Sequence, residues 1–164
     1  MKFLADGMLG KLTRWLRMIG CDVKYFNDLN DEELINISIE ENRILLTRDI
    51  ELFRRALSRG AAAFFVEGRN EIEKLAEISE HFNVKLEINV EKSRCPKCNA
   101  RIRPVSKEEV KERVPPATFR FYSEFWECPS CGQIYWQGSH WRKINRTLLE
   151  AKNKIKSSKR DADG

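Results

Sequence analysis

The chain has 164 residues, of which 41% are hydrophobic and 34% are charged, and its formal net charge is +5. This hydrophobic content is sufficient for a folded core and excludes a disordered chain. The sequence has no apolar run of the roughly 18 residues that a membrane span needs. Asp6 also interrupts the N-terminal apolar run too early for a signal peptide, so we expect a cytoplasmic protein that does not associate with membranes.

Charge is divided unevenly along the chain. Residues 1–90 carry 13 basic and 16 acidic side chains, whereas residues 91–164 carry 17 basic and 9 acidic ones. This asymmetry favours two modules, of which the basic one suits a polyanion such as nucleic acid. A solvated basic surface is the alternative, and charge alone does not separate the two.

The first ninety residues alternate between short strand-like and longer helix-like segments. This order predicts an α/β fold, with right-handed crossovers and a parallel sheet flanked by helices. Functional sites in such sheets lie at the carboxyl ends of the strands. The predicted strands are Lys2–Ala5, Val23–Phe26, Arg43–Thr47, Ala61–Val66 (as a central strand) and Lys85–Val90. The predicted helices are Gly10–Ile19, a helix capped by Asn30 or Asp31, Ile50–Arg59 and Glu71–Phe82.

The pattern changes after Val90. Residues 91–146 are rich in Cys, Pro, Trp and Arg and lack long periodic segments, so we expect a second, small domain there. One short helix is predicted over Lys107–Arg113, ended by Pro115-Pro116. Residues 147–164 are polar and lysine-rich, and we predict a basic, flexible tail.

Four of the five cysteines form two copies of one motif, Cys95-Pro96-Lys97-Cys98 and Cys128-Pro129-Ser130-Cys131. The Cys-x-x-Cys spacing lets two thiolates bind one tetrahedral ion, and two such turns complete a Cys₄ zinc site. The 29 residues between the turns exceed the usual ~15–20, which indicates an insertion in a zinc ribbon. A pair of disulfides or redox motifs is the alternative. A closed Cys₄ site is structural and not catalytic, and the lone Cys21 is expected to be a small buried hydrophobe.

Several carboxylates follow predicted strands directly. Asp6 ends the first strand, Asp28 and Asp31 follow the second, and Asp49 follows the third. Acids that converge on one sheet edge repel one another unless a cation joins them, and oxygen ligands suit Mg²⁺ or Mn²⁺. The alternative is that these acids are helix caps and turn residues, a role that fits Asp28 and Asp31 well.

The residues also resemble a known family, the PIN-like RNase domains named for the C-terminal region of mut-seven exonucleases. The similarity covers about residues 1–145. Its N-terminal motifs are Phe3-Leu4-Ala5-Asp6-Gly7-Met8-Leu9-Gly10-Lys11-Leu12, Arg14-Trp15-Leu16-Arg17 and Leu45-Leu46-Thr47-Arg48-Asp49. Its C-terminal motifs are Arg94-Cys95-Pro96-Lys97-Cys98-Asn99, Val114-Pro115-Pro116, Phe125-Trp126-Glu127-Cys128-Pro129-Ser130-Cys131-Gly132 and Ile134-Tyr135-Trp136-Gln137-Gly138-Ser139-His140-Trp141.

This resemblance implies a PIN-like domain over residues 1–90, a zinc ribbon over residues 91–146 and metal-dependent ribonuclease activity. By motif position, it assigns Asp6 and Asp49 as metal-binding catalytic acids, with Asp31 as the third. Glu67 is the candidate for a fourth acid by topology alone. If only three acids are present, a single Mg²⁺ is more plausible than a two-metal mechanism.

Basic and aromatic residues supply candidate RNA contacts. We predict phosphate contacts from Arg14, Arg17 and Arg48 near the acids, and from Arg142 and Lys143 in the second module. For Arg14 and Arg17, ion pairing with Glu32 or Glu33 is the alternative. Aromatic side chains among these cations can stack unpaired bases, or they can form the core of the small domain; they are Tyr135, Trp136 and Trp141.

The sequence therefore predicts a metal-dependent endoribonuclease. In this hypothesis the acids hold Mg²⁺ or Mn²⁺, which activates water, and a basic zinc ribbon recruits RNA. A second hypothesis is a non-catalytic adaptor that binds RNA or a ribonucleoprotein on the same fold. A third is a DNA nuclease, which a comparison of matched RNA and DNA substrates would separate.

Overall fold

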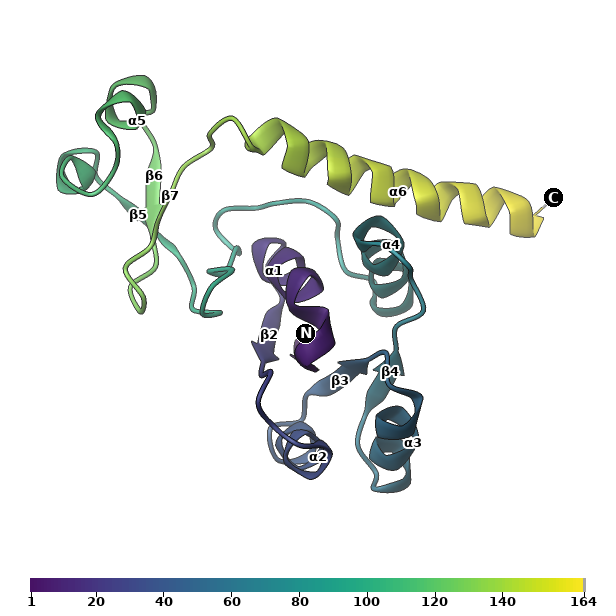
Figure 1. Cartoon of the computed structure of the whole chain (residues 1–164). Helices are drawn as coiled ribbons and strands as arrows, with labels where there is room; N and C mark the ends of the chain where they lie inside the picture. The colour runs from purple at the N-terminus through teal and green to yellow at the C-terminus, as the bar shows by residue number, and fades with distance from the viewer. Residues whose placement is uncertain (164) are drawn as a thin grey trace.

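A computed structural model describes residues 1–163 of the chain, with side chains as far as Lys159. Its first half is a parallel four-stranded sheet with helices on both faces, and its second half is a small antiparallel sheet followed by one long helix (Figure 1). The predicted α/β fold is therefore confirmed. Within the described residues, no helix is both long enough and apolar enough to cross a membrane.

The parallel sheet has the strand order β2-β1-β3-β4. Leu4 on β1 pairs with Lys24 on β2 and with Leu45 on β3, and β4 pairs only with β3. The strands are β1 (Lys2–Ala5), β2 (Asp22–Tyr25), β3 (Ile44–Thr47) and β4 (Ala63–Phe65). Between them lie η1 (Gly7–Leu9), α1 (Gly10–Met18), α2 (Asp31–Glu40), α3 (Ile50–Ser58) and α4 (Glu71–Phe82).

Alternate residues of the strands point to opposite faces and make two cores. Phe3 and Leu46 are fully buried on the face covered by α1 and α4. Leu4 and Leu45 are fully buried on the other face, beneath α2 and α3. Because both faces are covered, the carboxyl edge of the sheet is where the polar side chains after each strand gather.

Two strand predictions differ from the structure. Ala61–Val66 was expected to be a central strand, but β4 is shorter and lies at the edge of the sheet. Lys85–Val90 forms no strand; Leu86 is buried in the core instead, at 3% exposure. Its apolar alternation therefore reflects one buried face and not backbone pairing.

The second module is a three-stranded antiparallel sheet, β5 (Arg103–Val105), β6 (Phe125–Glu127) and β7 (Ile134–Tyr135). The short helix predicted over Lys107–Arg113 is a single 3₁₀ turn, η2 (Glu108–Val110). This turn ends at Val110, before the proline pair that was predicted to end the helix. Pro116 instead begins another helix, α5 (Pro116–Phe121). Proline suits a first helical turn, where its missing N–H has no partner to lose.

The predicted flexible tail is wrong for the residues that the structure describes. Helix α6 (Trp141–Asp163) returns from the second module and lies along α4 (Figure 1). Its apolar residues recur at helical spacing and join the first core: Leu148 and Ala151 are buried, and Ile144 and Ile155 are partly buried. This stripe anchors a helix whose remaining surface is charged.

Candidate functional site

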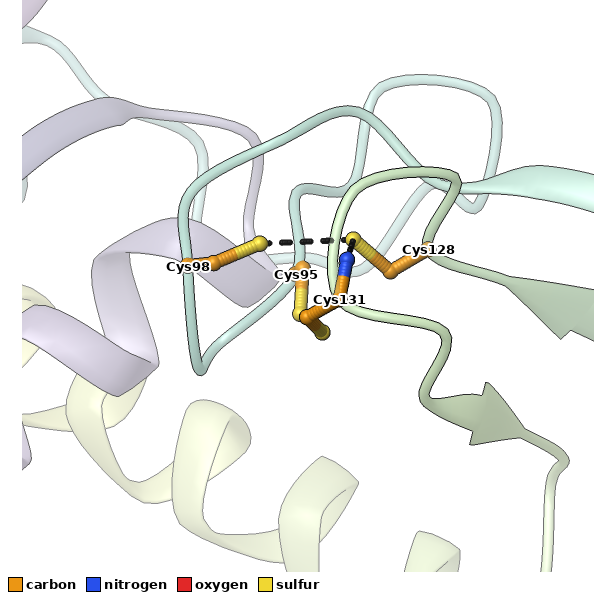
Figure 2. A group of neighbouring side chains, drawn as sticks. All are labelled: Cys95, Cys98, Cys128 and Cys131. Carbon is orange, nitrogen blue, oxygen red and sulfur yellow. Dashed lines mark hydrogen bonds between the residues drawn. The ribbon is translucent and has the colours of Figure 1, made fainter.

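The four cysteines of the two Cys-x-x-Cys motifs converge, as Figure 2 shows. Their sulfur atoms all lie within 4.8 Å of one another, with Cys95 Sγ and Cys131 Sγ 3.7 Å apart and Cys98 Sγ and Cys128 Sγ 3.3 Å apart. A tetrahedral zinc with Zn–S bonds of ~2.3 Å places its sulfurs about 3.8 Å apart. The four thiols therefore fit a structural zinc ion, and all five cysteines are free of disulfides.

The turns that carry these cysteines need left-handed residues. Asn99 and Gly132, each directly after the second cysteine of its motif, have φ values of 75° and 80°. Their backbone amides donate to the carbonyls of Cys95 and Cys128, at 2.8 and 2.9 Å. Asn and Gly adopt this conformation at the lowest cost, so both residue types suit the backbone of their turns.

Tyr135 on β7 supports the cysteine site from outside. Its Oη lies 2.9 Å from Cys95 Sγ, a hydrogen-bonding distance. Burial, followed by the hydrogen bond to Cys95, raises the pKa of Tyr135 above its ordinary value, so the phenol stays protonated as a donor. Such outer partners orient the sulfur of a metal ligand.

The first cysteine turn is joined to the parallel sheet by hydrogen bonds. Asn99 Oδ1 accepts from the backbone amide of Val23 on edge strand β2 at 3.0 Å, and Asn99 Nδ2 donates to Asp22 Oδ1 at 2.7 Å. From the other side, Arg17 Nη1 donates to the carbonyl of Pro96 at 2.9 Å. These contacts place the cysteine site against α1 and β2 of the N-terminal domain.

Asp22 accepts hydrogen bonds from Arg43 and from Asn99 at this junction. Burial opposes its ionisation, but hydrogen bonds from Arg43 and Asn99 hold the pKa of the Asp22 carboxyl below its ordinary value. The Arg43 guanidinium is itself only 6% exposed, and it also donates to the carbonyl of Phe3 at 3.1 Å. The motifs did not reveal this network, because its members are distant in sequence.

Asp6 and Asp49 lie at the carboxyl ends of neighbouring strands and share one partner, Thr47. Thr47 Oγ1 donates to Asp6 Oδ2 and accepts from the backbone amide of Asp49 at 3.0 Å. Asp6 is 5% exposed, and its Oδ1 accepts from the amide of Met8 at 3.0 Å. Asp49 also caps α3, with Oδ1 accepting from the amides of Glu51 and Leu52 at 2.9 and 3.2 Å.

The other two candidate acids lie apart from this pair. Asp31 opens α2 and is paired with Arg55 of α3 at 3.2 Å, while Asn30 is the residue that caps the helix. Glu67 is exposed in the turn after β4. Among the residues whose side chains the structure describes, only one group of three or more His, Cys, Asp or Glu residues has all its ligand atoms within 4.8 Å of one another. This group is the four cysteines. Asp6, Asp31 and Asp49 thus do not form a closed set of ligands.

A basic groove of about 460 Å³ lies beside the acid pair, between α1 and the first cysteine turn. Lys11 and Arg14 line it from α1, and Lys97 lines it from the cysteine turn. Tyr25 also lines it, and its Oη donates to the carbonyl of Gly7, the residue after Asp6, at 2.9 Å. The groove therefore runs from the cysteine turn toward Gly7, and neither Asp6 nor Asp49 is among the residues that line it.

The basic residues singled out from the sequence have different surroundings. Arg14 is exposed in the groove, and its proposed alternative partners are otherwise engaged: Glu32 pairs with Arg55 and Arg59, and Glu33 accepts from the amide of Asn30. Arg142 and Lys143 are exposed in the first turn of α6.

Arg17 and Arg48 differ from this pattern because each one joins parts of the protein. Arg17 is 6% exposed, and besides Pro96 it donates from Nε to the carbonyl of Val23 at 2.9 Å. Arg48 donates to the carbonyl of Gly68, tying the turn after β3 to the turn after β4. Arg17 thus positions the cysteine turn, and it also lines the groove, so its contact with phosphate stays a prediction.

Comparison with known proteins identifies this combination of an α/β domain and a Cys₄ module. The family model for the Mut7-C RNAse domain matches residues 1–148, so the chain belongs to this family, and the resemblance read from the motifs is confirmed. No curated protein and no solved structure matches the chain. Membership indicates a nuclease or RNA-related function.

Proposed function

We propose that this protein is a metal-dependent endoribonuclease that hydrolyses RNA phosphodiester bonds, with the zinc ribbon assisting RNA binding. The observation that carries the proposal is the pair of acids at the carboxyl ends of β1 and β3, joined through Thr47 beside a basic groove. Membership of an RNase domain family supports the same activity.

In this proposal, Asp6 and Asp49 hold Mg²⁺ or Mn²⁺, since carboxylate oxygens are the ligands that these ions prefer. When bound, such an ion lowers the pKa of water and stabilises negative charge on a phosphodiester. Thr47 orients Asp6 through its hydroxyl, and Asp31 completes the set only if it leaves Arg55. Lys11 and Arg14 bind the phosphates of the strand in the groove.

The zinc ion is proposed for the four cysteines. Four thiolates leave no open coordination position, so the ion has a structural role. Its contribution is to fold a small module whose hydrophobic cluster has three buried members, Val110, Phe125 and Ile134. The module also brings Lys97 to the groove.

The test is cleavage of a labelled structured RNA with loops, in Mg²⁺, in Mn²⁺ or with neither ion, by protein loaded with zinc. The Asp6→Asn/Asp49→Asn variant should lose the metal-dependent cleavage. Asp28→Asn is the control, because it makes the same type of substitution at one exposed residue that follows β2, and it should cleave normally. Equal cutting by wild type and the double variant would assign the activity to a contaminant and reject the proposal.

A non-catalytic adaptor that binds RNA is the second candidate, and one observation favours it. Both oxygens of Asp6 and Oδ1 of Asp49 accept hydrogen bonds from the protein, as caps and turn acids do. If the wild type and the double variant bind RNA equally and neither cuts it, the adaptor is correct. A matched DNA strand in the same assay tests for DNA cleavage, since contacts to the 2′-hydroxyl distinguish the two substrates.

A further inference from the structure

An apolar pocket lies between the zinc ribbon, the linker after α4 and the start of α6. Its volume is about 280 Å³, and it is lined by three of the four tryptophans of the chain, Trp126, Trp136 and Trp141. Met18 and Ile88 line it from the N-terminal domain side. Protein interiors leave few voids larger than a water molecule, so an apolar hollow of this size at a domain junction is a candidate ligand site.

The size of the pocket limits what it can hold. Pockets for drug-sized ligands measure roughly 300–1,000 Å³, and 280 Å³ lies just below that range. A flat ring system therefore fits better than an extended molecule. Gln137 is the one lining residue with a side-chain amide, and it is exposed. An amide can donate to and accept from the polar edge of a planar ring.

The surroundings of the pocket are basic. Arg142 and Lys143 directly follow Trp141, both are exposed, and neither forms an ion pair with the described residues. Between Trp141 and Lys159, α6 carries seven basic side chains and one acidic one, Glu150. Aromatic rings among cations are the arrangement that stacks unpaired bases while the charges bind phosphates.

The pocket and the groove between α1 and the first cysteine turn have one lining residue in common. Pro96 of the first cysteine turn lines both, and Lys97, the next residue, lines the groove. A single strand held at the tryptophans would have to cross the cysteine turn at these two residues to reach Lys11 and Arg14. This path ends next to Gly7, the residue that follows Asp6.

We propose that this pocket binds one unpaired nucleobase of a single-stranded RNA and so holds the strand in the groove. The inference rests on the proposed RNA function but not on cleavage. Trp141 supplies the ring that is least committed to the fold: Trp126 is 9% exposed on β6, and Trp136 packs against Phe125 with ring centroids 6.2 Å apart. Base recognition by stacking tolerates any base, so the pocket fixes strandedness and not sequence.

The experiment titrates zinc-loaded protein with hexaadenylate and with the same ribose–phosphate chain without bases, in buffer that lacks Mg²⁺ and Mn²⁺. Hexaadenylate should quench the tryptophan fluorescence and bind more tightly than the abasic chain. Trp141→Leu, which keeps apolar volume but loses the ring, should weaken hexaadenylate binding on the order of tenfold. Trp141→Phe should restore most of the affinity. Trp15→Phe, on α1 and outside the pocket, is the control for fluorescence.

A salt series separates stacking from charge. The slope of log affinity against log salt counts phosphate contacts, so Trp141→Leu should lower the affinity without changing this slope. Equal binding of the two chains, or unchanged affinity of Trp141→Leu, would overturn the pocket while leaving the nuclease proposal intact. Normal quenching without cleavage in the Mg²⁺ assay would reject the nuclease and keep the pocket. If wild type binds neither chain, the pocket proposal is overturned.

Discussion

Thr47 shows how one residue can connect two acids that the sequence presents separately. It is fully buried, donates to Asp6 and accepts from the amide of Asp49. A hydroxyl can do both at once, because it carries one donor and two lone pairs. Valine has the same shape as threonine but can do neither.

Thr47→Val should therefore damage both stability and the proposed activity. It leaves a carboxylate oxygen and an amide without their partner, which should lower the free energy of unfolding by about 1–3 kcal/mol. Loss of a group that orients a metal ligand should reduce RNA cleavage on the order of 10–100-fold. Urea unfolding and the cleavage assay measure the two effects.

Ser38→Ala is the matched control for this change. Ser38 is also buried and donates from Oγ to the carbonyl of Arg43 at 2.6 Å, but it lies near the end of α2, away from the acids. It should lose stability and keep its cleavage rate. If both variants cleave RNA at the same rate, Thr47 has no role in positioning Asp6.

Cys21 gives a second prediction at the scale of one residue. Its side chain is 5% exposed, and burial raises the pKa of its thiol to about 11. In the unfolded chain the thiol ionises at its ordinary, lower pKa. Below that pKa the thiol is protonated in both states, so the contribution of Cys21 to the free energy of unfolding is fully present there. It is then lost as the pH rises toward the folded value.

The free energy of unfolding should accordingly fall between about pH 9 and pH 11, by on the order of 2 kcal/mol from this group. Cys21→Ala should be less stable at neutral pH but should show a shallower decline over the same range. Guanidinium unfolding of both proteins at stepped pH measures the difference. Parallel curves would show that Cys21 does not titrate with folding.

Among the elements, α6 is the one whose amino-acid composition led to the wrong prediction. Its apolar residues 144, 148, 151 and 155 lie on one face at helical spacing and pack on α4 and the first core. The abundant lysines of this segment led to the prediction of a flexible tail, although lysine is itself a good helix former. The decisive signal was the spacing of four apolar residues, not the polar average.

Leu148 and Leu149 test this account, because they are adjacent and chemically identical. Leu148 is 2% exposed, whereas Leu149 is 56% exposed. Leu148→Ala should lower the free energy of unfolding by about 2–5 kcal/mol, since it leaves a cavity against α4. Leu149→Ala should change it by less than about 0.5 kcal/mol. Similar losses in denaturant unfolding would mean that α6 does not pack on this face.

Most of the other helices and strands could be predicted from local sequence patterns. Alternating strands and helices were predictable because a cap such as Asn30 and a buried strand such as Ile44–Thr47 can each be recognised within a few residues. Topology then placed Asp6 and Asp49 at one edge. The edge position of β4 and the contact between Asn99 and Val23 depend on partners that are distant in sequence. No local pattern contains that information.

For the whole molecule, the first cysteine turn is the joint between the two modules. It extends edge strand β2 by a hydrogen bond from the amide of Val23 to Asn99, and it holds Asp22 and Arg17 from either side. The conformation of Asn99 is left-handed and follows directly after Cys98. A change in the metal site should therefore reach β2 through Asn99 and through Arg17, which donates to the carbonyls of Pro96 and Val23.

Removal of zinc with a chelator should loosen β2 and leave the centre of the sheet intact. Small metal sites fold only with their ion bound, so the turn should open and Asn99 should release the amide of Val23. Hydrogen exchange at Val23 should then become at least several-fold faster, the effect of losing one hydrogen bond. The amide of Leu45, which donates to the carbonyl of Ala62 at 2.9 Å, is the internal control and should stay protected.

Asn99→Ala should reproduce the faster exchange at Val23 with zinc still bound, because it removes the acceptor without removing a cysteine. If the exchange rate of the Val23 amide is unchanged in both samples, the metal site does not stabilise strand β2.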